Sequence, residues 1–291
     1  MPRTALARWT RKLAPYAFLP FVLPRYRLRP SIRILMYHRV ARLDAYDQLT
    51  VVPERFERQM ALLASEFRLL SLPQAVTELV QGGPQRAGVV VTFDDGYRDN
   101  LEFALPILKK YGVPATIFVT SRFCDQHQRH PRYSEEPGRL HLNWEEVKCI
   151  ARMPGMSIGS HTLTHPYLSR VDSQTAEAEI AESRATIGAG LGADVEFFCY
   201  PSGDFTARER AMVQRAGYRA AVSVGPGSNH RGTDLFALRR TEVTDRDEPE
   251  DLKLKLIGGY DPIHLLLHQR RERDFARARL ATAATSSRIP R

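Results

Sequence analysis

The chain has 291 residues, of which 43% are hydrophobic and 26% charged, so it is an ordinary soluble globular protein with room for one barrel-like domain or two smaller ones. Its net charge is +9, but residues 1–43 hold ten Lys or Arg and no acid, residues 269–291 have a net charge of +5, and the segment between them is mildly acidic. A nucleic-acid-binding protein would carry a basic face on its folded domain, and this distribution therefore argues against nucleic acid as a partner.

Residues 1–30 combine basic and aromatic side chains. This composition favours binding to an anionic membrane surface, with a disordered basic tail as the alternative. The apolar stretch 13–23 contains Pro15 and Pro20 and is too short to span a bilayer. It also lacks a clear small-residue cleavage site, and the odd number of cysteines suits a reducing compartment. We therefore expect a cytoplasmic protein, peripheral at the inner membrane, rather than one with a signal peptide.

The rest of the chain is predicted to alternate between strands and helices, the pattern of a parallel sheet or barrel. About seven buried strands are expected, at 31–38, 88–93, 114–120, 156–160, 195–200, 218–223 and 236–240. Helices are expected from Pro53, near 73–80, and at 100–111, 144–151, 173–187 and 206–216, with an Arg-rich helix from Gln269 that frays into a tail.

The strand predicted over 88–93 ends in two adjacent carboxylates, Asp94 and Asp95, followed by Gly96. A buried parallel strand can deliver acidic side chains to the open end of a barrel in this way. Two like charges so close together repel each other unless a cation or a proton neutralises one of them. The alternative, a helix N-cap, explains one of the two aspartates but not both.

Two histidines, His161 and His165, follow the strand predicted at 156–160. Their rings can face one point if residues 161–165 form a helical turn. One carboxylate and two imidazoles leave a coordination position for water, which is the arrangement of a hydrolytic zinc centre. The second carboxylate is then available as a base.

These blocks, Thr-Phe-Asp-Asp-Gly at 92–96 and Ser-His-Thr-Leu-Thr-His at 160–165, resemble the first two motifs of the polysaccharide deacetylases, the family 4 carbohydrate esterases with a nodulation-type deacetylase domain. The resemblance covers roughly residues 31–260. It implies a distorted, TIM-barrel-like (β/α)7 barrel, a divalent metal ion that is usually zinc, and hydrolysis of an N-acyl group on an amino sugar. Carried over residue by residue, it makes Asp95, His161 and His165 the metal ligands and Asp94 the general base.

The third family motif normally reads Arg-x-Pro-aromatic-Gly, and Cys199-Tyr200-Pro201-Ser202-Gly203 stands in its place. Pro201 and Gly203 match the motif and are expected beside the substrate. Ser202 replaces the aromatic residue, but its backbone N–H can still donate to an oxyanion. Cys199 replaces the arginine that steadies the catalytic aspartate in the family, and we expect Arg240 to supply that guanidinium.

Two histidines compete for the role of general acid. His38 lies in the block Tyr-His-Arg-Val at 37–40, which resembles the poly-N-acetylglucosamine deacetylases, whereas His268 ends a Leu-Leu-Leu-His run that superficially resembles the late family motif. We favour His38. Tyr97 is expected either to stack on a sugar or to pack in the core. Four further histidines, His127, His130, His141 and His230, are expected at the surface.

The resemblance divides the chain into a basic N-terminal segment (1–30), a catalytic domain (31–262) and an Arg-rich C-terminal helix and tail (263–291). Basic ends around an acidic body suit an enzyme at a membrane surface, so a lipid-linked amino sugar or a surface polysaccharide is the expected substrate. Two alternatives remain: a glycan-binding module without activity, and an amidohydrolase for a small cytosolic amide.

Overall fold

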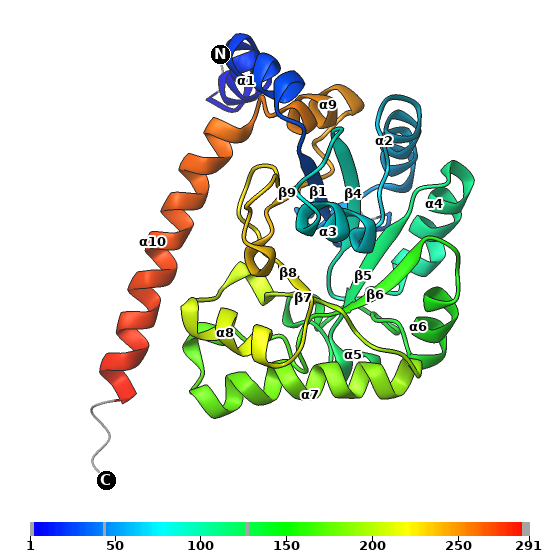
Figure 1. The fold of residues 1–291 in the computed structure, drawn as a ribbon, viewed down its shortest axis with the longest axis vertical. Coiled ribbons are helices and arrows are strands. Elements are labelled where there is room, and N and C mark those ends of the chain that lie inside the picture. The colour runs from blue at the N-terminus through cyan, green and yellow to red at the C-terminus, as the bar shows by residue number, and fades with distance from the viewer. Residues whose placement is uncertain (1–2, 43–44, 126–127, 287–291) are drawn as a thin grey trace.

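Seven parallel strands form one sheet that curves into a nearly closed barrel, with helices around its outside (Figure 1). The computed structural model describes residues 3–42, 45–125 and 128–286, with their side chains except those of 3–14, 27, 272 and 278–286. The strand order is β8-β7-β6-β5-β4-β1-β9, and neighbouring strands are parallel throughout. The predicted (β/α)7 architecture is confirmed.

The elements follow the predicted alternation closely up to the last strand. The barrel strands are β1 (Ile32–Tyr37), β4 (Gly88–Phe93), β5 (Ala115–Val119), β6 (Met156–Ser160), β7 (Phe197–Cys199), β8 (Ala220–Val222) and β9 (Arg240–Glu242), and β2 (Arg39–Val40) pairs separately with β3 (Thr50–Val51). The helices are α1 (Arg3–Leu28), α2 (Pro53–Glu66), α3 (Leu72–Val80), α4 (Leu105–Tyr111, preceded by a π-helical turn at Asn100–Ala104), α5 (Ser121–Cys124), α6 (Trp144–Ala151), α7 (Ser173–Leu191), α8 (Ala207–Arg215), α9 (Pro249–Ile257) and α10 (Asp261–Ser286).

Alternate residues along the strands belong to two separate hydrophobic clusters, because successive side chains of a strand point to opposite faces. One face packs against the outer helices, and the other packs with the apolar side of α3. Leu70, just before α3, would contact a side chain at Gly88, the first residue of β4. Helix α3 therefore covers the amino-terminal end of the barrel, at the opposite end from the residues that follow β4 and β6.

The last strand lies further along the chain than predicted. We expected it over 236–240, but Leu235–Ala237 is a 3-10 turn and β9 begins only at Arg240. Between them, the N–H of Leu238 donates to the carbonyl of Ala221 at 2.9 Å, whereas β9 itself pairs with β1. The chain thus crosses from the β8 edge of the sheet to the β1 edge and closes the barrel, a long-range constraint that no local pattern reveals.

The described parts of both basic ends of the chain are helical, at residues 3–28 and 261–286, whereas a disordered tail was the alternative considered for residues 1–30. Helix α10 begins at Asp261, whose carboxylate accepts two hydrogen bonds from Arg33 of β1, at 2.8 and 2.6 Å. Residues 287–291 of the predicted tail lie outside the described residues. Within the described ranges, no helix combines the length and the apolar character needed to cross a bilayer. The three-part division of the chain stays a prediction.

Gly159 of β6 leaves no space for a side chain. A Cβ there would lie 2.4 Å from the ring of Phe118 and 3.1 Å from the carbonyl oxygen of Phe197. We expect Gly159→Ala to lower the free energy of unfolding by about 1–3 kcal/mol, because the overpacked core must shift. Phe118→Leu should recover part of this loss in the double variant. Urea unfolding of wild type, both single variants and the double variant measures the coupling, and strictly additive losses would contradict this packing argument.

Candidate active site

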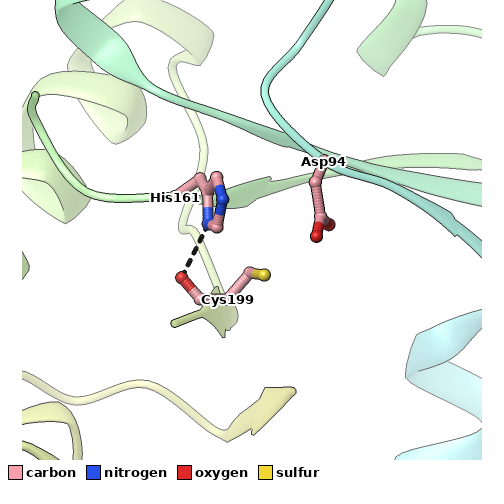
Figure 2. Close-up of side chains that lie close together, drawn as sticks. All are labelled: Asp94, His161 and Cys199. Carbon is pink, nitrogen blue, oxygen red and sulfur yellow. Dashed lines mark hydrogen bonds between the residues drawn. The ribbon is translucent and has the colours of Figure 1, made fainter. Parts of the chain in front are cut away.

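Residues from several strands meet at the carboxyl-terminal edge of the sheet, because parallel strands all end there. Asp94 and Asp95 follow β4, His161 follows β6, and Cys199 ends β7. Figure 2 shows Asp94, His161 and Cys199 gathered in one place. Potential ligand atoms of these three buried side chains lie within 4.8 Å of one another.

Asp94 is held by Arg240. The Nη1 and Nη2 atoms of Arg240 each donate to one carboxylate oxygen at 2.7 Å, and the arginine side chain is 0% exposed. Its Nε donates to the carbonyl of Ser223 at 2.8 Å, and Nη2 lies 3.1 Å from Cys199 Sγ. Burial acts to raise the pKa of Asp94, but the guanidinium outweighs it and keeps the pKa below its ordinary value. Asp94 is therefore ionised, and a guanidinium from β9 lies against the cysteine that replaces the family arginine.

Asp95 faces the two imidazoles. Its Oδ1 lies 3.4 Å from Nε2 of His161 and 3.4 Å from Nε2 of His165. That oxygen is buried and has no hydrogen-bond partner among the described residues. In a tetrahedral site with ligand bonds of about 2.0–2.1 Å, neighbouring ligand atoms lie about 3.3 Å apart. The separations of Asp95 Oδ1 from the two imidazole nitrogens are therefore those expected between ligands of a small divalent ion such as zinc. Asp95, His130 and His165 also offer ligand atoms that lie within 4.8 Å of one another.

Hydrogen bonding and charge also suit these residues to a cation. His161 Nδ1 lies 2.8 Å from the carbonyl oxygen of Cys199 (Figure 2), which fixes the proton on Nδ1 and turns Nε2 toward Asp95. Burial lowers the pKa of His165 to about 3, so its imidazole is neutral at pH 7. Burial acts to lower the pKa of His161 too, but Cys199 and Asp95 outweigh it and raise that pKa well above its ordinary value. The pocket thus favours a positive charge, which a metal ion supplies when it displaces a proton.

The carboxylate of Asp95 responds to the same neighbours. Burial acts to raise its pKa, but the two neighbouring imidazoles, His161 above all, outweigh burial and hold the pKa well below its ordinary value. An ionised carboxylate facing two imidazoles is a donor set that zinc accepts readily.

The two imidazoles face Asp95 without the helical turn that was given as a condition for their convergence. Thr162 and His165 both have left-handed backbone conformations, with φ of 67° and 65°. Glu179 of α7, which is 7% exposed, accepts hydrogen bonds from the N–H groups of Leu163 and Thr164, each at 2.9 Å. The buried carboxylate therefore pins a tight loop, and the two imidazole ring centroids lie 4.8 Å apart.

Two histidines expected at the surface lie beside the site instead. His130 is half-buried, with its ring centroid 5.1 Å from that of His165. His141 is 2% exposed, and its Nδ1 lies 3.0 Å from the backbone carbonyl of Asp95. Burial lowers the pKa of His141 to about 4. The surface prediction was wrong for these two histidines because residues 128–142 fold over the strand ends, where the N–H of Leu142 donates to the carbonyl of Gly96. His230 is exposed as expected, and His127 lies outside the described residues.

Tyr97 packs in the core rather than at an open rim. Its side chain is 0% exposed, its ring stacks on His141 with centroids 5.0 Å apart, and the guanidinium carbon of Arg39 lies 5.3 Å from its centroid. This position corresponds to the core-packing alternative. Tyr97 supports the histidine that contacts Asp95 and offers no ring face to solvent.

The turn after β7 has the backbone shape expected of an anion-binding turn. Ser202 has a φ of 55°, and its N–H donates no hydrogen bond to any described residue. Gly203 also has a positive φ, 68°, and a Cβ there would lie 2.3 Å from the side chain of Val224. Pro201 is buried next to them. Glycine is therefore required at position 203 both by the positive φ and by the lack of space for a Cβ. The backbone of Ser202 is strained, and its N–H remains available as a hydrogen-bond donor.

The two candidates for the general acid lie in different surroundings. His38 follows β1, its Nε2 is 3.9 Å from Asp94 Oδ2, and its side chain is 15% exposed. His268 is on α10, which runs along the outside of the barrel (Figure 1), and its Nε2 lies against Gly225 in the turn after β8. The structure therefore brings His38 next to Asp94.

Solved structures share this fold. The Streptococcus pyogenes deacetylase PplD, solved in complex with acetate, superposes with a TM-score of 0.70 at 24% identity, covering 78% of this chain and 99% of that one. IcaB from Ammonifex degensii superposes with a TM-score of 0.67 at 20% identity, covering 79% and 98%. At these identities the likeness establishes the fold alone.

Sequence similarity identifies the family. The family model described as polysaccharide deacetylase matches residues 81–221. The Bacillus subtilis (strain 168) protein YxkH, whose name assigns it provisionally to the polysaccharide deacetylases, is 32% identical over 216 residues, which are 74% of this chain and 72% of the relative. This chain therefore belongs to the polysaccharide deacetylase family.

Proposed function

We propose that this protein is a metal-dependent deacetylase that hydrolyses the N-acyl group, an acetyl group in the first instance, of an amino sugar in a surface polysaccharide or a lipid-linked glycan. Family membership supports a hydrolase acting on an acetylated glycan. The observation that carries the metal dependence is the buried Asp95 Oδ1, which lies 3.4 Å from an imidazole nitrogen of each of two histidines and has no other partner among the described residues.

Asp95, His161 and His165 would hold the ion, and their donor set favours zinc. Such an ion, when bound, lowers the pKa of a bound water and polarises the acyl carbonyl.

Three other residues act as the general base, the oxyanion donor and the general acid. Asp94, kept ionised by Arg240, accepts the proton of the attacking water. The free N–H of Ser202 donates to the developing oxyanion. His38 gives a proton to the departing nitrogen, because an unprotonated amine anion is a very poor leaving group. Its separation of 3.9 Å from Asp94 supports this assignment, since acid and base must reach the same amide bond.

The substrate proposal rests on charge. The catalytic body is mildly acidic, and both ends of the chain are basic. Such a distribution suits attachment to an anionic surface, where a lipid-linked amino sugar or a nascent surface glycan would be presented.

Asparagine variants of the two aspartates should lose activity for different reasons. We expect Asp95→Asn to lose bound metal and activity together, whereas Asp94→Asn should keep its metal and lose about a hundredfold to ten-thousandfold in turnover, the usual contribution of a general base. Metal analysis and acetate release from a panel of N-acetylated amino sugars, free and lipid-linked, measure this. A chelator should abolish wild-type activity. Full activity in metal-free protein would refute the proposal, and binding of the panel without turnover would favour a glycan-binding module.

Arg240 is proposed as a positioning residue that acts through Asp94. Arg240→Met should lower turnover with metal content unchanged. It should also move the acidic limb of the pH profile to higher pH, because the largest influence that lowers the pKa of Asp94 against burial is then removed. Arg240→Lys, which keeps the charge but not the two parallel hydrogen bonds, should restore part of the rate. Loss of a buried partner destabilises proteins by about 3–5 kcal/mol, so unfolding is measured in parallel. Wild-type rates with an unmoved acidic limb would end the proposal.

His38 and His268 can be separated by matched alanine substitutions. We expect His38→Ala to keep its metal and to lose most of its turnover, since the leaving nitrogen then has no proton donor. His268→Ala should retain nearly all activity. Measured rates in the reverse order would transfer the acid role to α10.

A further inference from the structure

A cavity lies at the end of the barrel opposite the candidate active site. It has a volume of about 270 Å³ and lies between α1, the loop 82–84, the turn around 228–231 and the α9–α10 junction. Its walls include Ser31, which precedes β1, so it opens at the amino-terminal edge of the sheet, away from the carboxylates and histidines at the carboxyl-terminal edge. The proposed deacetylation makes no use of it.

The charge around this cavity is strongly one-sided. Four arginines line it, Arg25 and Arg29 from α1, Arg33 from β1 and Arg231 from the turn after β8, against a single carboxylate, Asp261. That carboxylate is already engaged by Arg33 through two hydrogen bonds, at 2.8 and 2.6 Å. The guanidiniums of the other three arginines have no ion-pair or hydrogen-bond partner among the side chains that the structure describes.

An ordinary structural role accounts for only part of this cluster. Arg25 and Arg29 lie near the carboxyl-terminal end of α1, where positive charge complements the helix dipole. Arg231 belongs to a different segment, and its Cβ would lie 2.8 Å from a Cβ at Gly83, so the turn and the glycine loop are packed tightly together there. Arg25, Arg29 and Arg231 are exposed, so water and salt screen their mutual repulsion, but guanidiniums from separate segments that line one cavity still make it favourable for an anion.

We infer that this cavity binds a phosphate group, and that its natural source is the headgroup of an anionic lipid. Guanidiniums match phosphate oxygens through paired hydrogen bonds. The volume is slightly below the range of pockets for drug-sized molecules, and suits a headgroup. On α1, Phe21 and Leu28 share the helix face of Arg25 and are 78% and 80% exposed. Exposed apolar side chains beside a basic pocket are what a protein presents to a membrane interface.

Vesicle binding of the full-length protein tests the inference. We expect binding to vesicles of equimolar phosphatidylcholine and phosphatidylglycerol, and little binding to pure phosphatidylcholine. The double variant Arg25→Gln/Arg29→Gln should weaken binding about thirtyfold, from roughly fivefold for each basic residue near an anionic surface. The control Arg152→Gln/Arg246→Gln removes the same charge from two exposed arginines outside the cavity and should bind like wild type.

Two further arms identify the source of the phosphate and separate this inference from the proposed function. Phe21→Ser/Leu28→Ser should reduce vesicle binding without changing calorimetric binding of inorganic phosphate. A different result is that wild type binds inorganic phosphate but no vesicles, and that Arg25→Gln/Arg29→Gln loses the phosphate binding. That result would support the phosphate site and assign it to a soluble phosphate instead of a lipid. Equal losses in the pocket and control variants, or no binding of either probe, would overturn it. Asp95→Asn should bind vesicles normally, whatever its activity.

Discussion

The candidate active site depends on two adjacent buried carboxylates at the end of β4, whose negative charges repel each other. At so short a separation in a low-dielectric interior, two negative charges cannot both persist without separate cations. The backbone helps, because Asp95 has a φ of 67°, a conformation that aspartate tolerates better than most residues, and this turns neighbouring side chains toward different partners. Asp94 faces a guanidinium and Asp95 faces two imidazoles. The guanidinium thereby neutralises one charge, and in the proposed function the other charge binds the metal ion.

The ion pair between Arg240 and Asp94 depends on the way the barrel closes. A fully buried pair contributes little net stability, because desolvation offsets the attraction, so its value lies in holding Asp94 ionised and oriented. Arg240 reaches that position because the chain leaves the β8 edge at Leu238 and enters β9 beside β1. Cys199, short and buried, leaves space for the guanidinium to cross the barrel interior. The third motif has Cys199 where the family has an arginine. Arg240, on the late strand β9, supplies the positive charge beside Asp94 instead.

The barrel and the motif residues could be predicted from sequence because their signals are local. Apolar runs bounded by Gly, Pro and capping residues marked strands such as β6 and helices such as α6 closely. The loop of residues 161–165 could not be predicted, since its shape depends on a carboxylate from α7. Glu179 carried a weak signal, because it shares a helix face with Ala176 and Ser183, where a charge is unexpected. His130 and His141 carried none, as an irregular stretch has no periodicity to show which side it buries.

The separation of the two charged regions constrains how the protein meets its substrate. A six-residue strand spans about 20 Å at roughly 3.3 Å per residue, so the arginine cavity and the catalytic edge lie about that far apart. A single sugar attached directly to a phosphate in the cavity could not reach Asp94. The cavity therefore cannot be the phosphate subsite of a small sugar phosphate, and its role is attachment. With the amino-terminal end of the barrel held at a membrane, the catalytic edge faces away from the lipid, and a glycan must extend over several sugars to enter it. This geometry favours a surface polysaccharide or a long lipid-linked chain over a short lipid-linked sugar.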